Sequence, residues 1–227
     1  MTGAVGNLGA AVARAFAACN AKLALADRGS DRLAEAFSDL ADSSPLLLPD
    51  SDVTDEASVK GMVKRVLEES GRIDVLVNTV GGYRADTPVH EMSLDFWQQM
   101  LDLNARSVLL TCRAVLPAQL DAGHGKIVNV AARPGLKGSA GAAAYSAAKS
   151  AVIRLTESMA AEVRDKGVNV NCILPGTIDT PQNRDAMPDA ETSKWVQPES
   201  LADVVLFLAS DAARDIHGAA IPVYGRS

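Results

Sequence analysis

Apolar segments and helical segments alternate from end to end of the chain, and this alternation constrains the fold more than any other feature. Expected strands cover residues 22–26, 46–48, 73–77, 126–130, 168–174 and 219–223. Expected helices cover residues 10–19, 30–41, 54–70, 93–120 in two pieces, 142–166 and 198–210. Short apolar strands between helices are typical of a parallel sheet covered on both faces and joined by right-handed crossovers. The sequence therefore predicts an α/β fold with a doubly wound parallel sheet.

The expected elements follow one another without a linker, an internal repeat or a low-complexity tract, so one domain over residues 1–227 is predicted. Thr54 is the expected N-cap of its helix and Gly71 the expected stop. Residues 177–197 form the least regular stretch and are rich in Pro, Asp and Asn. We expect them to form a loop over a binding site.

Charge and composition exclude several classes of partner. The net charge is −6 and the chain has no basic run, which argues against nucleic acids and anionic membranes. No apolar run approaches the roughly 20 residues of a membrane span, and no signal peptide is recognisable. The three cysteines are scattered and the three histidines are isolated, so reduced thiols and no metal site are expected. These features favour a soluble globular protein with reduced thiols in the cytoplasm.

A glycine-rich turn opens the chain. Gly3, Gly6 and Gly9, with Asn7 and Leu8 between them, precede a helical run. Such a turn lets the backbone approach a diphosphate, which the N–H groups of the helix N-terminus then bind. Such a turn is typical of a Rossmann-type, NAD(P)-binding domain, although small-residue turns before helices are also common. In that fold the turn normally follows a strand. The first strand is therefore expected to be truncated: either the true start lies upstream of Met1, which we favour, or the fold tolerates the loss.

Acidic residues follow the next two strands. Asp27 can accept hydrogen bonds from the adenosine ribose and would repel a 2′-phosphate, so it favours NAD(H). Arg28 beside it keeps NADP(H) possible. Asp52 and Val53 can hold the adenine ring. On their own, both carboxylates also fit solvated loop positions.

Tyr145 and Lys149 stand four residues apart on an expected helix and so share one face. An ammonium beside a phenol favours the phenolate, and we expect Lys149 to lower the pKa of Tyr145. Such a pair can transfer a proton near neutral pH.

Five motifs in order resemble the short-chain dehydrogenase/reductase family over nearly the whole chain. They are Asn78-Thr79-Val80-Gly81, Leu103-Asn104-Ala105, Tyr145 with Lys149, Pro175-Gly176, and the tail 198–225. The resemblance implies catalytic roles for Tyr145, Lys149 and Asn104, with Asn104 supporting a water chain to Lys149. The cofactor-binding residues it implies are Gly3, Gly6, Asn7, Leu8, Gly9, Asp27, Asp52, Val53, Asn78, Gly81, Tyr145, Lys149, Pro175, Gly176, Ile178 and Thr180.

Three departures from the family pattern point toward one branch of it. Asn7 stands where glycine is commoner, and we expect it to tolerate the positive φ of the turn. Thr79 and Val80 replace Asn and Ala. Ala132 fills the position of a serine that hydrogen-bonds the substrate oxygen; Ser139 has the wrong spacing and is expected to be a loop hydroxyl. These departures are similar to those of dihydropteridine reductases. Asn104 argues the other way, because it belongs to the proton-relay arrangement of the wider family.

Candidate substrate residues follow from the same comparison. Tyr83 and Trp195 can stack on a flat, conjugated ring, or pack the lid instead. Ala132 and Arg133 lie beside the expected substrate, although a surface ion pair is the other interpretation of Arg133.

Three functions stay open at this point. The first is an oxidoreductase that transfers hydride between the nicotinamide and a small carbonyl, alcohol or conjugated ring. The second is a reductase of a quinonoid pterin-type ring, and the third is a dinucleotide-binding sensor or scaffold. The resemblance also implies a homodimer or homotetramer, paired through the helices at 93–120 and 142–166, where small residues of the second helix allow close approach.

Overall fold

The structure is a computed structural model that describes residues 1–226, with all side chains except those of residues 30, 31 and 41–43. Its strands are β1 (Ala24–Ala26), β2 (Leu46–Leu48), β3 (Val75–Asn78), β4 (Gly125–Val130), β5 (Val168–Pro175) and β6 (Ala220–Val223). Its α-helices are α1 (Asn7–Ala18), α2 (Ser30–Ala36), α3 (Glu56–Ser70), α4 (Leu94–Leu101), α5 (Ser107–Ala122), α6 (Ala143–Val163), α7 (Pro181–Ala186) and α8 (Pro198–Ala209). A π-helix, η3 (Asp102–Arg106), joins α4 to α5, and short 3₁₀ turns include η1 (Ser38–Ser43) and η4 (Arg133–Gly135).

The strands are all parallel, and they form two parts with the orders β2-β1 and β3-β4-β5-β6. Thr2 bridges the two parts, because it pairs with Ala26 on one side and with Asn78 on the other. From Thr2 the chain moves outward to β1 and β2, and then returns to β3 and continues the other way. Such a switch point is where open α/β sheets bind ligands, at the carboxyl ends of the strands.

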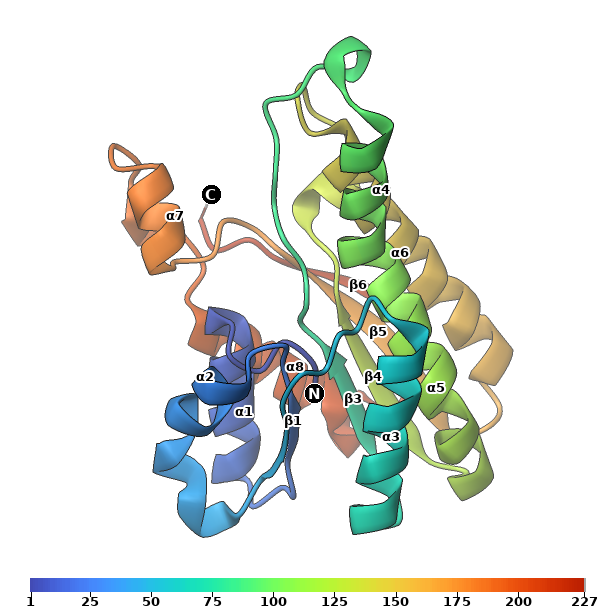
Figure 1. The fold of residues 1–227 in the computed structure, drawn as a ribbon. Helices are drawn as coiled ribbons and strands as arrows, with labels where there is room; N and C mark the ends of the chain where they lie inside the picture. The colour runs from blue at the N-terminus through green and yellow to red at the C-terminus, as the bar shows by residue number, and fades with distance from the viewer. Residues whose placement is uncertain (227) are drawn as a thin grey trace.

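Helices cover both faces of the sheet (Figure 1). On one face, α3, α5 and α6 pack on the strands through a core that includes Val63, Val115 and Val152. On the other face, α1 and α8 pack through Val12 and Leu201, and α2 joins α1 around β1. Every residue of β4 and β5 is buried, as expected for central strands that helices cover on both faces. Their polar residues Lys126, Asn129, Asn169 and Asn171 are hydrogen-bonded. The predicted doubly wound parallel sheet is confirmed.

Most expected elements are present within a few residues of their expected bounds, and three details differ. The helix expected over residues 30–41 ends at Ala36, and the 3₁₀ turn η1 follows. Asp55, not Thr54, caps α3, because its carboxylate accepts from the Ser58 N–H. The expected stop at Gly71 is confirmed by its left-handed backbone, with φ of 71°. The expected loop over residues 177–197 contains α7 and a 3₁₀ turn.

Only Met1 and Thr2, among the described residues, stand where a strand would separate β1 from β3. The Met1 amino group donates to Ala24 O at 2.6 Å, and Met1 O accepts from the Ala26 N–H at 2.9 Å. Burial lowers the pKa of the Met1 amino group to about 6.

For a chain prepared to begin at Met1, this enclosed amine predicts a rise of stability with pH. Its pKa is near 8.0 in the unfolded chain and about 6 in the fold, so the unfolded chain binds more protons between these values. The free energy of unfolding should therefore rise from pH 6 to pH 8, by roughly 2 kcal/mol, since each pKa unit corresponds to about 1.4 kcal/mol. Urea titrations across this range measure it. Burial also lowers the pKa of His217, so the measurement is made in His217→Asn, where a flat profile would contradict the assignment to Met1.

Membrane-spanning helices and metal-binding clusters are both absent from the part of the chain that the structure describes. No helix there is both long enough and apolar enough to cross a membrane. Within the same residues, no three His, Cys, Asp or Glu side chains gather as a metal site would require.

Candidate active site

The glycine turn leads directly into α1 at the switch point. Gly3 carries the positive φ of the turn, at 68°, and the Gly3 O accepts from the Gly6 N–H at 3.1 Å. Asn7 begins α1 in a helical conformation, so the expectation that Asn7 needs a positive φ was wrong. A Cβ on Gly9 would stand 2.1 Å from Gly3 O. Only glycine therefore lets the helix pack this closely against the turn.

These features fit a dinucleotide. Gly6, the N-cap of α1, makes no side-chain cap, so the N–H groups of Asn7 and Leu8 have no cap acceptor. They lie at the positive end of the helix dipole, where a diphosphate binds. The structure thus brings together the predicted diphosphate residues Gly3, Gly6, Asn7, Leu8 and Gly9.

The residues predicted to bind adenosine lie beside this turn, but they are not equally available to a ligand. One Asp27 carboxylate oxygen accepts from the Val5 N–H at 3.1 Å, which fixes Asp27 against the turn. Asp52 accepts from the Thr54 hydroxyl and N–H, and the hydroxyl in particular lowers the pKa of the Asp52 carboxyl. Arg28 is exposed and lies 4.0 Å from Asp52. Val53 is only 4% exposed and its side chain packs in the core, so it has little surface for adenine.

Asn78 was expected to line the cofactor groove, but its side chain is hydrogen-bonded inside the protein instead. Its amide donates to Asn129 Oδ1 at 2.9 Å and accepts from the hydroxyls of Thr111 and Thr2. Asn129 in turn donates to Thr156. This buried polar network ties the turn, β3, β4 and two helices together behind the site. The neighbouring departure at Thr79 has a structural reason, because its hydroxyl donates to Thr2 O at 2.8 Å.

Asn104 is placed by the π-helix η3, which the sequence did not predict. One wider turn leaves backbone groups of the helix without their usual partners. The Asn104 amide donates to Met100 O and to Gly82 O, both at 3.1 Å, and its oxygen accepts from the Gly82 N–H at 3.0 Å. Fully buried, Asn104 clamps the segment after β3 onto the helix.

Lys149 reaches the same point from α6. Its ammonium donates to Val130 O at 2.8 Å and lies 5.9 Å from the centre of the Tyr145 ring. A Cβ on Gly81 would stand 3.0 Å from Asn104 Oδ1 and 3.2 Å from Lys149 Nζ. Asn104 and Lys149 therefore approach each other on either side of Gly81. The relay between them stays a prediction.

The acidity of Tyr145 differs from the expectation. Burial, with a contribution from Tyr83, raises the pKa of Tyr145 to about 12, and burial lowers the pKa of Lys149 to about 8. The expected lowering of the Tyr145 pKa by Lys149 is therefore wrong for this structure. The reason is that both groups are desolvated and the ammonium is directed at Val130 O, not at the phenol oxygen.

The segment with Ala132 is fixed beside this pair. Gly135 packs on the backbone of Lys149, where a Cβ would stand 2.9 Å from its carbonyl, and Gly135 O accepts from the Ser150 hydroxyl at 2.6 Å. Ala132 itself is buried and offers no hydroxyl. The Arg133 guanidinium lies 4.9 Å from the centre of the Tyr224 ring. Ser139 is exposed in the following loop, which agrees with its interpretation as a loop hydroxyl.

The lid follows β5. The Gly176 N–H donates to Val223 O, Ile178 pairs with Val196, and the Thr180 hydroxyl caps α7 by accepting from the Asn183 N–H. Hydrogen bonds, first from Arg184 and then from Gln197, hold the pKa of Asp179 at about 2. The lid is therefore anchored at its base and carries the predicted cofactor residues Pro175, Gly176, Ile178 and Thr180.

One contact that was not predicted connects the lid to the glycine turn. The Asn7 amide donates to Gln182 Oε1 in α7 at 2.9 Å. The two groups are 175 positions apart, so no local pattern marks them.

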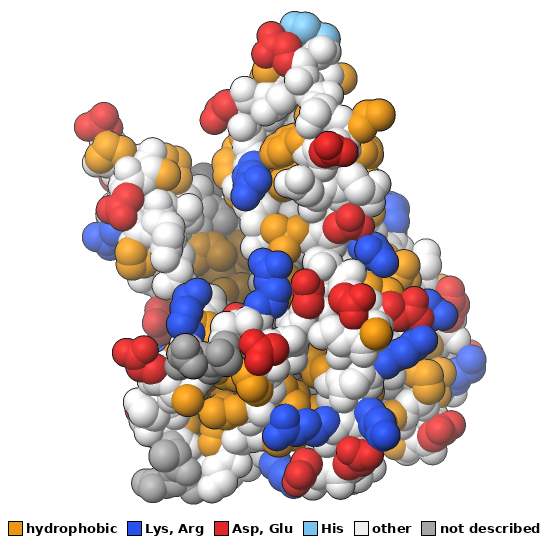
Figure 2. All heavy atoms as spheres, viewed as in Figure 1, with side chains coloured by type: hydrophobic (Ala, Val, Ile, Leu, Met, Phe, Trp, Pro, Cys, Tyr) orange, Lys and Arg blue, Asp and Glu red, His pale blue; other side chains and the backbone are white. Residues whose placement is uncertain are grey.

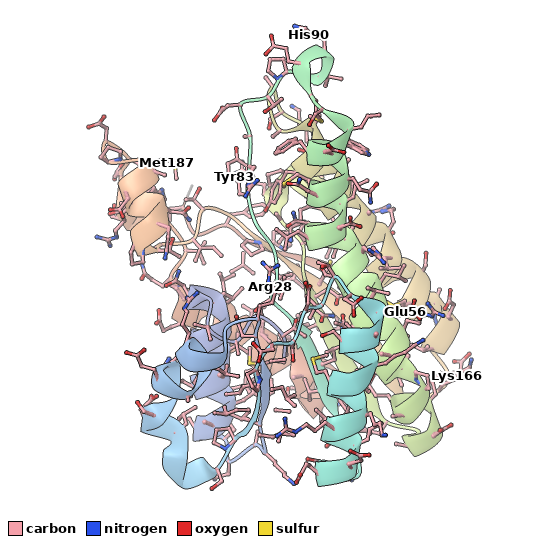
Figure 3. The ribbon with its side chains drawn as sticks, in the orientation of Figure 1. Arg28, Glu56, Tyr83, His90, Lys166 and Met187 are labelled. Carbon is pink, nitrogen blue, oxygen red and sulfur yellow. The ribbon has the colours of Figure 1, made fainter. Side chains whose placement is uncertain are left out.

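Two aromatic residues had been expected at the substrate. Tyr83 is 65% exposed, and its ring meets the Tyr145 ring edge-on at 5.0 Å between centres. Trp195 is only 8% exposed, so little of its ring is available for stacking on a substrate. Figure 2 shows the surface hollowed between α7 and the segment that leads to α4, and Figure 3 places Met187 and Tyr83 on its two sides.

Comparison with known proteins identifies the family. A family model described as enoyl-(acyl carrier protein) reductase matches residues 3–225. The chain is 35% identical to cis-4-hydroxycyclohexanecarboxylate dehydrogenase of Sinomonas cyclohexanicum, over 99% of this chain and 94% of the relative. The chain belongs to the short-chain dehydrogenase/reductase family. It is therefore an NAD(P)-dependent oxidoreductase of alcohols or carbonyl compounds.

Other short-chain dehydrogenases/reductases are similarly related. Meso-2,3-butanediol dehydrogenase of Serratia marcescens is 37% identical over 99% of this chain and 92% of the relative. The 3-oxoacyl-[acyl-carrier-protein] reductase of Escherichia coli is 33% identical, with 99% and 94% covered. A crystal structure of NAD⁺-bound xylitol dehydrogenase superposes with a TM-score of 0.90 at 27% identity, covering 99% of this chain and 96% of that one. These matches support the family of the earlier resemblance; none of these relatives is a pterin reductase.

Proposed function

We propose that the protein transfers hydride between NAD(H) and a small cyclic or conjugated carbonyl compound, with Tyr145 as the proton donor. The observation that carries this proposal is the convergence of Tyr145, Lys149 and Asn104 around Gly81, at the switch point beside the glycine turn. A bound nicotinamide would supply the hydride. Binding of the cofactor, orientation of the substrate and transfer of the proton depend on residues of this chain.

The protonation states favour the reductive direction. With a pKa of about 12, the Tyr145 phenol keeps its proton at neutral pH and can give it to a developing alkoxide. Lys149, with a pKa of about 8, stays mostly cationic at neutral pH and donates to Val130 O beside Tyr145. Asn104 and Gly82 are hydrogen-bonded to each other on the side of the site opposite Lys149.

Ala132 narrows the substrate class. A missing donor to a developing oxyanion typically costs a factor of about 10²–10³ in rate. That loss matters least for an electron-poor, conjugated acceptor, whose negative charge is delocalised. Tyr83, exposed beside Tyr145, offers a ring on which such a substrate can stack.

Restoring the hydroxyl tests this argument. In Ala132→Ser we expect kcat/KM for simple, unconjugated ketones to rise about tenfold, because one oxyanion donor is regained. The rate for a conjugated ring should change by less than about threefold. Steady-state kinetics on matched cyclohexanone and quinone substrates measure both values, and an unchanged ketone rate would count against the role of position 132.

A quinonoid pterin-type substrate remains a second candidate, because Gly81-Gly82-Tyr83 and Ala132 favour a flat acceptor. It is weakened by the burial of Trp195, which was expected to form the other wall. A panel of acceptors with NADH decides: faster reduction of a quinonoid dihydropterin than of cyclic ketones supports it, and the reverse order discards it. A sensor or scaffold without turnover is discarded by any reliable oxidation of NADH in the panel.

Asp27 predicts a preference for NADH. Its carboxylate is fixed against the turn where the adenosine ribose would lie, and it would repel a 2′-phosphate. We expect fluorescence titration to give a Kd for NADH roughly tenfold or more below that for NADPH. In Asp27→Ser the two Kd values should converge, because exposed Arg28 then faces the phosphate. Tighter binding of NADPH by the unaltered protein would overturn the assignment.

Self-association as a homodimer or homotetramer stays a prediction. Part of its original basis was wrong, because Ala142, Ala144 and Ala148 are buried within this chain and cannot approach a partner. Leu109 on α5 is 44% exposed and remains available to such an interface.

A further inference from the structure

The helix α7 at the tip of the lid has few contacts of its own. It is six residues long, and none of these residues is buried. Figure 1 shows α7 standing apart from the sheet and from the helices that cover it. A helix this short is not stable by itself in water, so its order depends on contacts with other parts of the protein.

Most hydrogen bonds of α7 stay within the lid, residues 176–197. The Asn183 amide, for example, donates to Ile178 O at 2.8 Å. Among the described residues, one hydrogen bond joins α7 to the rest of the fold: the Asn7 amide donates to Gln182 Oε1 at 2.9 Å. This bond therefore holds the tip of the lid against the glycine turn, while the base of the lid is fixed separately.

The position of Asn7 connects this bond to the cofactor site. Asn7 is the first residue of α1, and its N–H is one of those without a cap acceptor at the predicted diphosphate site. The side chain of the same residue reaches the lid. Glycine, the commoner residue of the family at this position, has no side chain that could do so. Asn7 and Gln182 are both exposed, so water can replace the bond when the lid moves.

We propose that Asn7 and Gln182 form a latch that holds α7 against the glycine turn, and that this latch sets how fast the dinucleotide enters and leaves. The place of the cofactor in this inference rests on the proposed function. Asn7 and Gln182 are positioning residues here, since they act on the lid and not on the reacting atoms. Because both partners belong to the protein, the bond can form with or without the cofactor, and it must break for entry as well as for exit.

This arrangement predicts a distinctive pattern of rates. An interaction that is equally strong in the free and the bound protein changes no affinity. Loss of the latch should therefore raise kon and koff for NADH together and leave Kd within about twofold of its original value. The net effect of a hydrogen bond between exposed groups is small, so we expect each rate constant to rise about three- to tenfold.

Gln182→Ala, Asn7→Ala and the double variant test this pattern by stopped-flow fluorescence with NADH. Each single variant should show the rise, and the double variant should rise no further than either, because all three lack the same bond. Asp185→Ala is the matched control, since Asp185 is another exposed residue of α7. Its rate constants should stay within about twofold of those of the unaltered protein.

Hydrogen exchange tests the latch in the protein without NADH. The Arg184 amide donates to Thr180 O at 3.0 Å in the first turn of α7. Without the latch, α7 should open more often, so this amide should exchange about three- to tenfold faster in Gln182→Ala and in Asn7→Ala, but not in the control.

Two results would overturn the proposal. One is unchanged exchange of the Arg184 amide in both single variants. The other is a rise of koff and Kd in Asn7→Ala with no change in Gln182→Ala, which would mean that the Asn7 side chain holds the cofactor directly. A protein that binds no NADH would contradict the proposed function instead, and the exchange measurement would still decide whether the latch exists.

Discussion

Tyr145→Phe should lower kcat/KM by roughly 10²–10⁴-fold, because it removes the only atom by which this side chain can transfer a proton. The ring itself should stay in place, since its contacts to Tyr83 and Lys149 involve the face and edge of the ring. The Kd for NADH, measured by fluorescence, is therefore expected to change by less than about threefold. Stopped-flow and steady-state rates with the best acceptor of the panel measure the loss.

Ser139→Ala is the matched control for this prediction. It removes a hydroxyl from the same stretch of chain, but Ser139 is exposed in a loop six residues before Tyr145. We expect its rate to stay near that of the unaltered protein. A Tyr145→Phe enzyme that keeps most of its activity would assign the proton transfer to another group, and an equally slow Ser139→Ala would show that the loop, not the phenol, limits the rate.

Gly9→Ala should destabilise the protein by about 3 kcal/mol and raise the Kd for NADH at least about tenfold. The added Cβ would lie 2.1 Å from Gly3 O, and also 3.0 Å from the Ala4 backbone, so the turn must move away from α1. The N–H groups at the start of that helix then lose their aim at a diphosphate. Urea unfolding and NADH titration on the same preparation measure the two effects.

Gly61→Ala is the matched control for Gly9→Ala, and we expect it to stabilise the protein. Gly61 lies inside α3, where a Cβ would meet nothing within 4 Å. Alanine is the better helix former, so this variant should be stabilised by about 0.5–1 kcal/mol with unchanged NADH binding. A similar loss in both variants would mean that the close contact at Gly9 is not what matters.

The fold was predictable because strand and helix signals repeat along the whole chain. The cofactor turn and the Tyr145–Lys149 pair were likewise marked by local spacing. What failed were expectations that depend on tertiary surroundings. Nothing local to Trp195 shows that it is buried. The pKa of Tyr145 rises because of burial, whereas spacing alone pointed only to the nearby ammonium.

Long-range polar contacts were equally invisible in the sequence. Asn78 was assigned to the cofactor groove because of its motif. Its side chain instead hydrogen-bonds to partners 33 and 51 positions away and connects the elements behind the site. The π-helix is a further case, since no residue type in Asp102–Arg106 demands the wider turn. It becomes intelligible only once Asn104 is seen to accept from Gly82 N–H and to donate to Met100 O.

That wider turn limits how the protein can vary in length. A helix advances about 100° per residue, so one deletion or insertion between α4 and Asn104 would rotate the amide away from Gly82. Substitutions on the solvent side of this segment should be tolerated, whereas single-residue changes of length should not. Loops elsewhere on the surface carry no such restriction, and alignments of functional relatives should keep this interval gap-free.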